Sequence, residues 1–301
     1  MTHRIVLTSS KGGTGKTTTA LNLAVALAER GRNTIIVDLD PQGAIGLFLS
    51  KEDSDWSGLA EVMISGAAPR EVLLTTSLPT LRILARGRID PVDTCEYELR
   101  LHRGTVLSET LAAIEDDGAV DYILIDTPSG LGPVTRAALA ASHFALLPLQ
   151  AEPVAFRTLS QILRVLDHVR RHENPSLQLL GILPTMVRLD NDPSLNVMSS
   201  VWSGFGGVLD TVIPRSDVFI QASEIGIPLS FLGGRTRPEA RRYTLLSDEI
   251  EARINNMTGI EEDNEHRRLV CRGHRARAVA GAQRARNRVG ARRRRVALSP
   301  V

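Results

Sequence analysis

Short runs of valine, isoleucine and leucine recur along the chain and alternate with longer stretches in which apolar positions follow helical spacing. The runs lack the polar alternation of a half-exposed strand, so we expect strands that are covered on both faces. This pattern favours an α/β fold with a doubly wound, mostly parallel sheet and helices on both faces. The predicted strands cover residues 5–7, 34–37, 81–85, 122–125, 144–147, 179–183 and 211–213, and the predicted helices cover 17–30, 105–115, 154–171 and 239–254.

The pattern ends near residue 258, which divides the chain into a predicted folded domain, 1–258, and a tail, 259–301. The tail is rich in Arg, Ala and Gly and has too few large apolar residues to form a core of its own. Three interpretations stay open: a disordered basic tail, an Arg- and Ala-rich helix that folds on an anionic partner, or an extension without a role. The composition favours the disordered tail.

The formal charge of +2 hides a strong asymmetry. Twelve Arg and no acidic residue lie between Arg267 and the C-terminus, Arg295 being the last, whereas residues 1–266 hold 24 Lys plus Arg against 34 Asp plus Glu. An acidic body with a basic tail indicates a nucleic-acid or anionic-surface partner. A hydrophobic content of 43% excludes wholesale disorder. No uncharged apolar run reaches the roughly 18 residues that span a bilayer, and we predict a cytoplasmic protein.

The first predicted strand runs into a glycine-rich loop that opens the first predicted helix, with the sequence SKGGTGKTT from Ser10. Glycines let successive backbone N–H groups converge on a phosphate, and the helix N-terminus adds positive potential. We expect Lys16 to reach the β- and γ-phosphates of a nucleotide and the Thr17 hydroxyl to coordinate Mg²⁺. The usual pattern has glycine in place of Ser10. The other predicted nucleotide-binding residues of the loop are Gly12, Gly13, Thr14, Gly15 and Thr18.

The sequence KGGTGKTT resembles the KGGxGKTT loop of the ParA/MinD family of deviant-Walker P-loop ATPases. The family's second lysine, here Lys11, crosses an ATP-bound homodimer to contact phosphates held by the other subunit. The resemblance therefore implies ATP, Mg²⁺ and an ATP-dependent homodimer. A cation supplied by the partner couples dimerisation to ATP and offsets charge that develops during phosphoryl transfer. The chain has three lysines, and two of them, Lys11 and Lys16, occupy these positions.

Two acidic motifs lie at the ends of later predicted strands. Asp38 and Asp40, in DLDPQG, resemble the family's DxDPQG motif. The resemblance implies that Asp40 orients or activates the attacking water and that Asp38 supports the Mg²⁺ region. Asp126 ends an apolar strand in the manner of a Walker-B carboxylate, which binds Mg²⁺ directly or through water. The family commonly has a second proline where this chain has Ser129.

The resemblance covers roughly residues 3–255, and within the family the sequence is similar to the ParA/Soj partition branch. That branch has TxIPR, then EA, then GxP, and this chain has TVIPR from Thr211, then QA and GIP. By resemblance, the loop around Pro214 and the end of the preceding strand flank the adenine. The chain departs from the branch at Gln221, which replaces Glu, and at Val218, which replaces a residue that is often basic.

The resemblance implies a slow ATPase, stimulated by a ParB-like partner and associated with the nucleoid, that positions DNA or another cargo through non-specific DNA binding. Such binding neutralises phosphates with basic residues. One alternative is a MinD-like membrane-associated ATPase that regulates cell division or polar positioning, although the tail lacks a strong apolar face, which disfavours a membrane partner. Another is a metabolic P-loop kinase or ligase. The candidate DNA-binding residues are the tail and Arg235, Arg237, Arg241 and Arg242, where nearby acids make a solvated helix face equally compatible.

Overall fold

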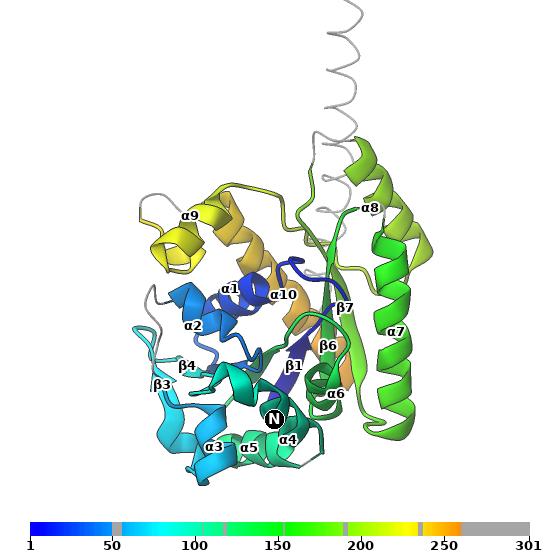
Figure 1. Ribbon diagram of the computed structural model, residues 1–301. Helices are drawn as coiled ribbons and strands as arrows, with labels where there is room; N and C mark the ends of the chain where they lie inside the picture. Colours follow the sequence, from blue (N-terminus) through cyan, green and yellow to red (C-terminus); the bar gives the residue numbers. More distant parts are fainter. Residues whose placement is uncertain are drawn as a thin grey trace, which may run out of the picture.

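The computed structural model describes residues 1–49, 56–103, 105–116, 119–152, 154–188, 192–233 and 237–259. Its described part is built around a seven-stranded sheet with the order β3-β4-β2-β5-β1-β6-β7. Only the edge strand β3 is antiparallel to its neighbour (Figure 1). The strands are β1 (His3–Leu7), β2 (Thr34–Asp38), β3 (Leu73–Thr75), β4 (Leu81–Leu84), β5 (Tyr122–Asp126), β6 (Phe144–Gln150) and β7 (Gln178–Thr185).

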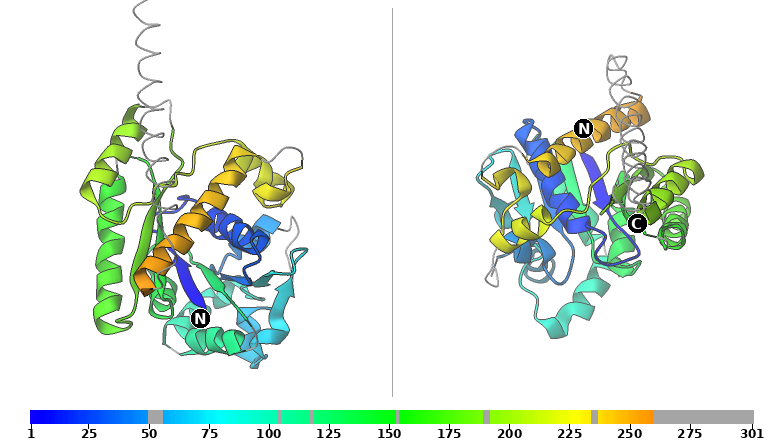
Figure 2. Two further views of the ribbon diagram at one scale, coloured as in Figure 1. Left: turned by 180° about the vertical axis from the view of Figure 1, so that it is seen from behind. Right: turned by 90° about the horizontal axis from the view of Figure 1, so that it is seen from above.

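Helices cover both faces of the sheet, as Figure 2 shows from behind and from above. Successive side chains of a strand enter opposite cores, because side chains alternate between the faces. Ile5 packs in the core beneath α1 and α10, whereas its neighbour Val6 packs in the core beneath α3 to α7. The described helices are α1 (Lys16–Glu29), α2 (Ala44–Leu49), α3 (Leu59–Ser65), α4 (Thr94–Arg103), α5 (Val106–Asp116), α6 (Pro133–Ala140), α7 (Ala155–His172), α8 (Asp192–Gly204), α9 (Val218–Ile225) and α10 (Pro238–Thr258), with short 3₁₀ turns at η1 (Pro69–Val72), η2 (Pro91–Asp93) and η3 (Leu229–Phe231).

The predicted fold class is confirmed, as are six of the seven predicted strands and all four predicted helices. The strand predicted at 211–213 is wrong. That segment lies beside the end of β7, where the Ile213 N–H donates to the Pro184 carbonyl at 2.9 Å, but only an isolated bridge joins Val187 to Pro214. Pro184 has no N–H to donate toward this segment, so no continuous ladder forms beside it. The seventh strand is instead β3, whose three residues are too few to give a pattern.

The helix α10 ends at Thr258, and Gly259 follows with a φ of 74°, a left-handed conformation that commonly stops a helix. The predicted domain boundary coincides with this helix end and stays a prediction. The basic tail lies outside the described residues. Within the described residues, no helix combines the length and the apolarity needed to cross a membrane.

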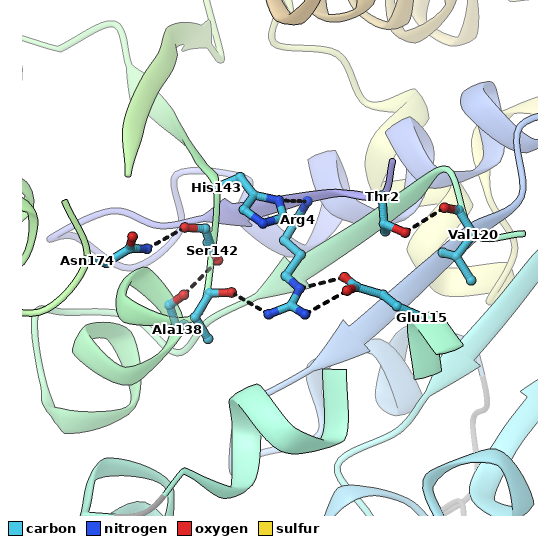
Figure 3. Close-up of polar contacts among 9 residues, drawn as sticks. Thr2, Arg4, Glu115, Val120, Ala138, Ser142, His143 and Asn174 are labelled. Carbon is cyan, nitrogen blue, oxygen red and sulfur yellow. Dashed lines mark hydrogen bonds and ion pairs between the residues drawn. The ribbon is translucent and has the colours of Figure 1, made fainter. Parts of the chain in front are cut away.

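Polar side chains close the amino ends of the strands (Figure 3). The Arg4 guanidinium donates to both carboxylate oxygens of Glu115, at 2.6 and 2.7 Å, and to the Ala141 carbonyl at 3.3 Å. The backbone N–H of Arg4 donates to Nδ1 of His143 at 3.1 Å, and Asn174 donates to the Ser142 carbonyl at 2.6 Å. These contacts tie α5 and the loops after α6 and α7 to β1, so the amino edge is a satisfied, structural end of the sheet.

Candidate active site

Three central strands bring the motif residues together at the opposite, carboxyl edge. In the parallel register, Asp126 at the end of β5 pairs with Leu7 of β1 on one side and with Asp38 of β2 on the other. The glycine-rich loop begins directly after β1, so it lies beside both carboxylates. In doubly wound sheets this edge is where ligands bind.

The phosphate loop is fixed by its backbone and by hydroxyl groups beneath it. Gly13 and Gly15 have φ values of 71° and 84°, a left-handed region in which other residues are strained. The hydroxyls of Ser9 and Thr14 lie 2.8 Å apart, and the Thr185 hydroxyl donates to the Thr14 carbonyl at 2.9 Å. Thr14 is therefore a buried support of the loop. Gly12, Thr17 and Thr18 belong to the same turn and helix start.

The Lys16 side chain lies inside this loop and is only 6% exposed. Its ammonium donates to the Ser129 hydroxyl at 3.1 Å and to the Ser9 hydroxyl at 3.4 Å. Burial lowers the pKa of Lys16, while the carboxylates of Asp126 and Asp40 act in the opposite direction. Ser129, at the position where the family commonly has proline, is thus a polar neighbour of Lys16. Sequence reasoning identified the departure but not the contact.

Asp126 has the environment expected of a metal ligand. Both carboxylate oxygens are buried and have no well-formed hydrogen bond within the described part of the chain, although the Thr17 hydroxyl and the Thr127 N–H lie close enough to favour the charged form. Burial raises the pKa of Asp126 to about 7, against the opposing effects of the nearby Thr17 hydroxyl and Lys16. An unpartnered buried carboxylate is costly unless a cation or a proton neutralises it. Oxygen ligands of this kind suit Mg²⁺, so the residues present fit that ion.

Asp38 is equally buried but already engaged. Its two oxygens accept the backbone N–H groups of Asp40 at 3.1 Å and of Ile45 at 3.0 Å. Burial, followed by the neighbouring Asp126 charge, raises the pKa of Asp38 to about 8. Asp38 therefore organises the loop that carries Asp40.

The loop that carries Asp40 receives a second support from Arg86. Asp40 is half-buried and accepts the N–H of Gln42 at 2.9 Å. The Arg86 guanidinium donates to the Pro41 carbonyl and packs against Gly43, where an added Cβ would lie 2.6 Å from the Arg86 Nε. Gly43 also has a φ of 63°. Arg86 lies in no motif, and no spacing signal in the sequence could have identified it.

The Lys11 side chain points away from the centre of the phosphate loop to which it belongs. Its ammonium forms an ion pair with Glu152 at 2.7 Å and reaches the Gln150 side-chain oxygen at 3.4 Å. The Gln150 amide donates to the other Glu152 oxygen at 2.6 Å. Lys11 and Glu152 are 43% and 39% exposed, so water screens the pair and the contact is weak enough to exchange.

Pro214 lies next to the end of β7, which in turn supports the loop through Thr185. Between them lies Met186, with a φ of 51°, which is the one left-handed non-glycine residue within the described ranges. Its methyl group is close to Gly15, since a Cβ added to that glycine would lie 4.0 Å from it. Such a conformation costs about 1 kcal/mol and concentrates at functional sites. The region predicted to flank the adenine is therefore assembled from β7, Met186 and Pro214.

The candidate DNA-binding arginines at the start of α10 are only partly described, because Arg235 lies outside the described residues. The buried Nε of Arg237 has no hydrogen-bond partner in the described part of the chain, Arg241 is exposed, and Arg242 is half-buried. The Glu239 carboxylate lies among them and accepts the Ser216 hydroxyl at 2.8 Å.

This sheet, loop and pair of buried carboxylates define a P-loop ATPase of the deviant-Walker class. A family model described as an AAA domain matches residues 2–179. The sporulation initiation inhibitor protein Soj of Bacillus subtilis is 34% identical over 257 residues, which cover 82% of this chain and 98% of Soj. The chromosome partitioning protein ParA of Caulobacter vibrioides is 34% identical, over 75% of this chain and 85% of ParA. The chain belongs to the ParA/MinD family, in its ParA/Soj branch, as the motifs predicted.

A solved structure supports the fold. Cobyrinic acid a,c-diamide synthase from Mycobacterium smegmatis, with bound ATP analog and magnesium, is 32% identical and superimposes with a TM-score of 0.68. The match covers 82% of this chain and 93% of the synthase. The fold is therefore shared by partition ATPases and by a metabolic enzyme, and the choice between these functions depends on the site and on sequence relatives.

Proposed function

We propose that this protein is an ATP-dependent dimerising ATPase that segregates DNA, or positions another cellular cargo, by nucleotide-gated, non-specific DNA binding. ATP is the nucleotide and Mg²⁺ the cofactor, in agreement with the ligands of the related synthase structure. The observation that carries the proposal is the placement of the two loop lysines. Lys16 lies inside the loop, whereas Lys11 is held outside it by Glu152, where a second subunit can receive it.

Different residues of the chain perform different steps of hydrolysis. The loop N–H groups and Lys16 would bind the phosphates, and Thr17, Asp38 and Asp126 would hold Mg²⁺. Bound there, Mg²⁺ neutralises charge on the phosphate oxygens. Asp40 positions the attacking water, and its loop is held by Asp38, which accepts the Asp40 N–H, and by Arg86, which donates to the Pro41 carbonyl. Pro214 and the end of β7 enclose the base.

Lys11 supplies the step that depends on the dimer. It exchanges Glu152 for phosphates bound by the partner, which offsets charge that develops as the γ-phosphate leaves. We expect Lys11→Ala to abolish hydrolysis while ATP binding stays measurable by equilibrium dialysis. Lys51→Ala, at the third lysine of the chain, is the matched control. Normal turnover in Lys11→Ala would refute the role of Lys11 across the dimer.

We further propose slow hydrolysis that a ParB-like partner stimulates, and association with the nucleoid. Co-sedimentation with DNA in ATP, ADP or no nucleotide tests the DNA-binding step, and retention with ATP alone is the expected result. A variant that lacks residues 267–301 measures the share contributed by the tail, and unchanged binding at physiological salt would show that the tail has none. Binding to vesicles that exceeds binding to DNA would favour the MinD-like alternative. A monomer whose turnover requires a small substrate would favour the metabolic one.

A further inference from the structure

The outer face of α7 carries a straight row of basic side chains. Arg157, Gln161, Arg164, His168 and Arg171 are all exposed, and their spacings of four and three residues place them on one side of the helix. We call Arg157, Arg164 and Arg171 the α7 arginine row. Its members repeat every seven residues, about 10.5 Å apart, and span about 21 Å. In Figures 1 and 2, α7 forms the outer flank of the molecule beside β7.

The helix that carries this row is rigidly held. Its inner face is buried in the core that also contains α4 to α6. The side chains of the row therefore extend from a fixed support, and binding requires ordering of the side chains alone. The buried residues of this inner face are Leu159, Ile162, Leu166 and Val169.

The charge of the row is largely uncompensated. Arg157 and Arg164 form no ion pair within the described residues. Arg171 pairs with Asp167, the single acidic residue of α7, at 2.9 Å but remains 69% exposed. Arg170 adds a further positive charge at 3.9 Å from the same carboxylate.

Neighbouring elements do not neutralise the row either. The neighbouring helix α8 begins with Asp192 and has no charged side chain between residues 195 and 204. On α6, Arg136 pairs with Glu173 at 2.7 Å, and its second nitrogen lies 3.3 Å from His168. The row is thus a positive strip on a body in which acidic residues exceed basic ones by ten. At the start of α10, by contrast, Glu239 lies among the arginines.

We propose that the α7 arginine row binds the phosphate backbone of duplex DNA. The proposal rests on the proposed function and names the surface that performs its DNA-binding step. Evenly spaced guanidinium groups on a rigid axis match a linear polyanion, and they contact phosphates without reading bases. A membrane is disfavoured because the line from Arg157 to Arg171 carries no apolar side chain to insert.

The row begins beside the phosphate loop. The Ser10 hydroxyl donates to the carbonyl of Thr158, the residue after Arg157, at 3.1 Å. Lys11 is held by Glu152 in the segment that leads into α7. A dimer that draws Lys11 across its interface therefore acts directly on the end of α7, and this contact links DNA binding to ATP.

The test uses the full-length chain with Arg157→Gln, Arg164→Gln and Arg171→Gln combined. Fluorescence anisotropy with a labelled duplex of arbitrary sequence, in ATP and Mg²⁺ over a salt series, reports affinity and its salt dependence. We expect binding at least ~30-fold weaker near 0.1 M salt and a log–log salt slope smaller by about 2.7. The control combines Arg70→Gln, Arg100→Gln and Arg103→Gln, which removes equal charge from η1 and α4, and should change affinity less than about threefold.

Dimerisation and DNA-free hydrolysis of each variant are measured with ATP. If the triple variant fails to dimerise, Arg164→Gln with Arg171→Gln, both distant from the loop, decides the matter, with an expected loss of about tenfold. Unchanged DNA binding by the Arg164→Gln, Arg171→Gln variant, or an equal loss of affinity in the control variant, would overturn the α7 proposal. ATP-dependent DNA binding by the wild type would still support the proposed function in that case. Loss of binding to phosphatidylglycerol vesicles with DNA binding intact would also overturn it. Absence of ATP-dependent DNA binding in the wild type would instead refute the proposed function.

Discussion

Two buried carboxylates at opposite edges of the same sheet have opposite environments. Glu251, near the amino edge, is 3% exposed and accepts hydrogen bonds from Arg32 and Arg30 at 2.7 and 2.8 Å. Asp126, at the carboxyl edge, is fully buried, and its oxygens have no hydrogen-bond partner in the described part of the chain. The first carboxylate is satisfied by two arginines, whereas the second has no well-formed hydrogen bond among the described residues.

The difference shows how this fold separates stability from function. At the amino edge, the contacts of Arg4 and Glu251 join loops and helices to the strands. At the carboxyl edge, we expect the buried Asp126 carboxylate and the left-handed Met186 to lower the stability of the free protein, as such groups commonly do at ligand sites. Four changes test this contrast, from the largest expected effect to the smallest.

Asp126→Asn should reduce ATP hydrolysis by about a thousandfold, because the metal region loses its charged ligand. The same change should stabilise the nucleotide-free protein by about 1–3 kcal/mol at pH 8, because a buried unpaired charge is removed. The folded pKa of Asp126, about 7, exceeds the ordinary value of 3.8, so its contribution to stability is complete below pH 3.8 and is lost as the pH rises through 7. Thermal unfolding from pH 5 to pH 8 measures this, and a less stable variant at pH 8 would contradict it.

Glu251→Gln makes the equivalent change at the other edge and should have the opposite result. Two arginines lose their shared counter-charge, and we expect a loss of about 2 kcal/mol of unfolding free energy. Turnover per folded molecule should stay within twofold of wild type, roughly the scatter expected for a remote site. Urea unfolding and ATPase assays on the same samples give both values. A large fall in turnover would show that the two edges are coupled.

His143 should make the amino edge sensitive to acid. Burial lowers its pKa, with a smaller contribution from Arg4 in the same direction. Because the unfolded histidine takes up a proton near pH 6.5 and the folded one does so only at lower pH, stability falls as the pH drops below about 6.5. His143→Gln should reduce the fall in Tm between pH 7 and pH 5 by roughly 2 °C. Identical profiles of Tm against pH in the variant and the wild type would show that His143 does not cause the acid sensitivity.

Ser129→Ala should have the smallest effect. It removes the hydroxyl that accepts from Lys16 in the nucleotide-free protein, so ATP should bind up to about fivefold tighter. Ser142→Ala is the matched control, since its hydroxyl bonds to the Ala138 carbonyl at the amino edge. Titration with a fluorescent ATP analogue compares the two, and weaker binding in Ser129→Ala would show that the hydroxyl serves the bound state.

Local sequence patterns predicted the fold well where an element depends on its own residues. Continuous apolar runs identified the buried strands, as in β2 and β5, every residue of which is buried. The pattern failed at 211–213 and at β3. In the first case Thr211, Val212 and Ile213 lie in a loop beside Pro214, and in the second a three-residue edge strand forms because β4 offers it a partner. Short elements depend on neighbours that a local pattern does not contain.

The same distinction holds for the site. The phosphate loop follows from nine consecutive residues, since its glycines, lysine and hydroxyls need only each other and the adjoining strand and helix. Packing decided which distant groups meet: Lys16 with Ser129, Arg86 with the Asp40 loop, and Lys11 with Glu152. It also decided that Asp38 is occupied by backbone N–H groups and that Asp126 is not. Motif spacing determines local backbone geometry. The partner of a side chain depends on which strands are neighbours in the sheet, and that is a property of the whole fold.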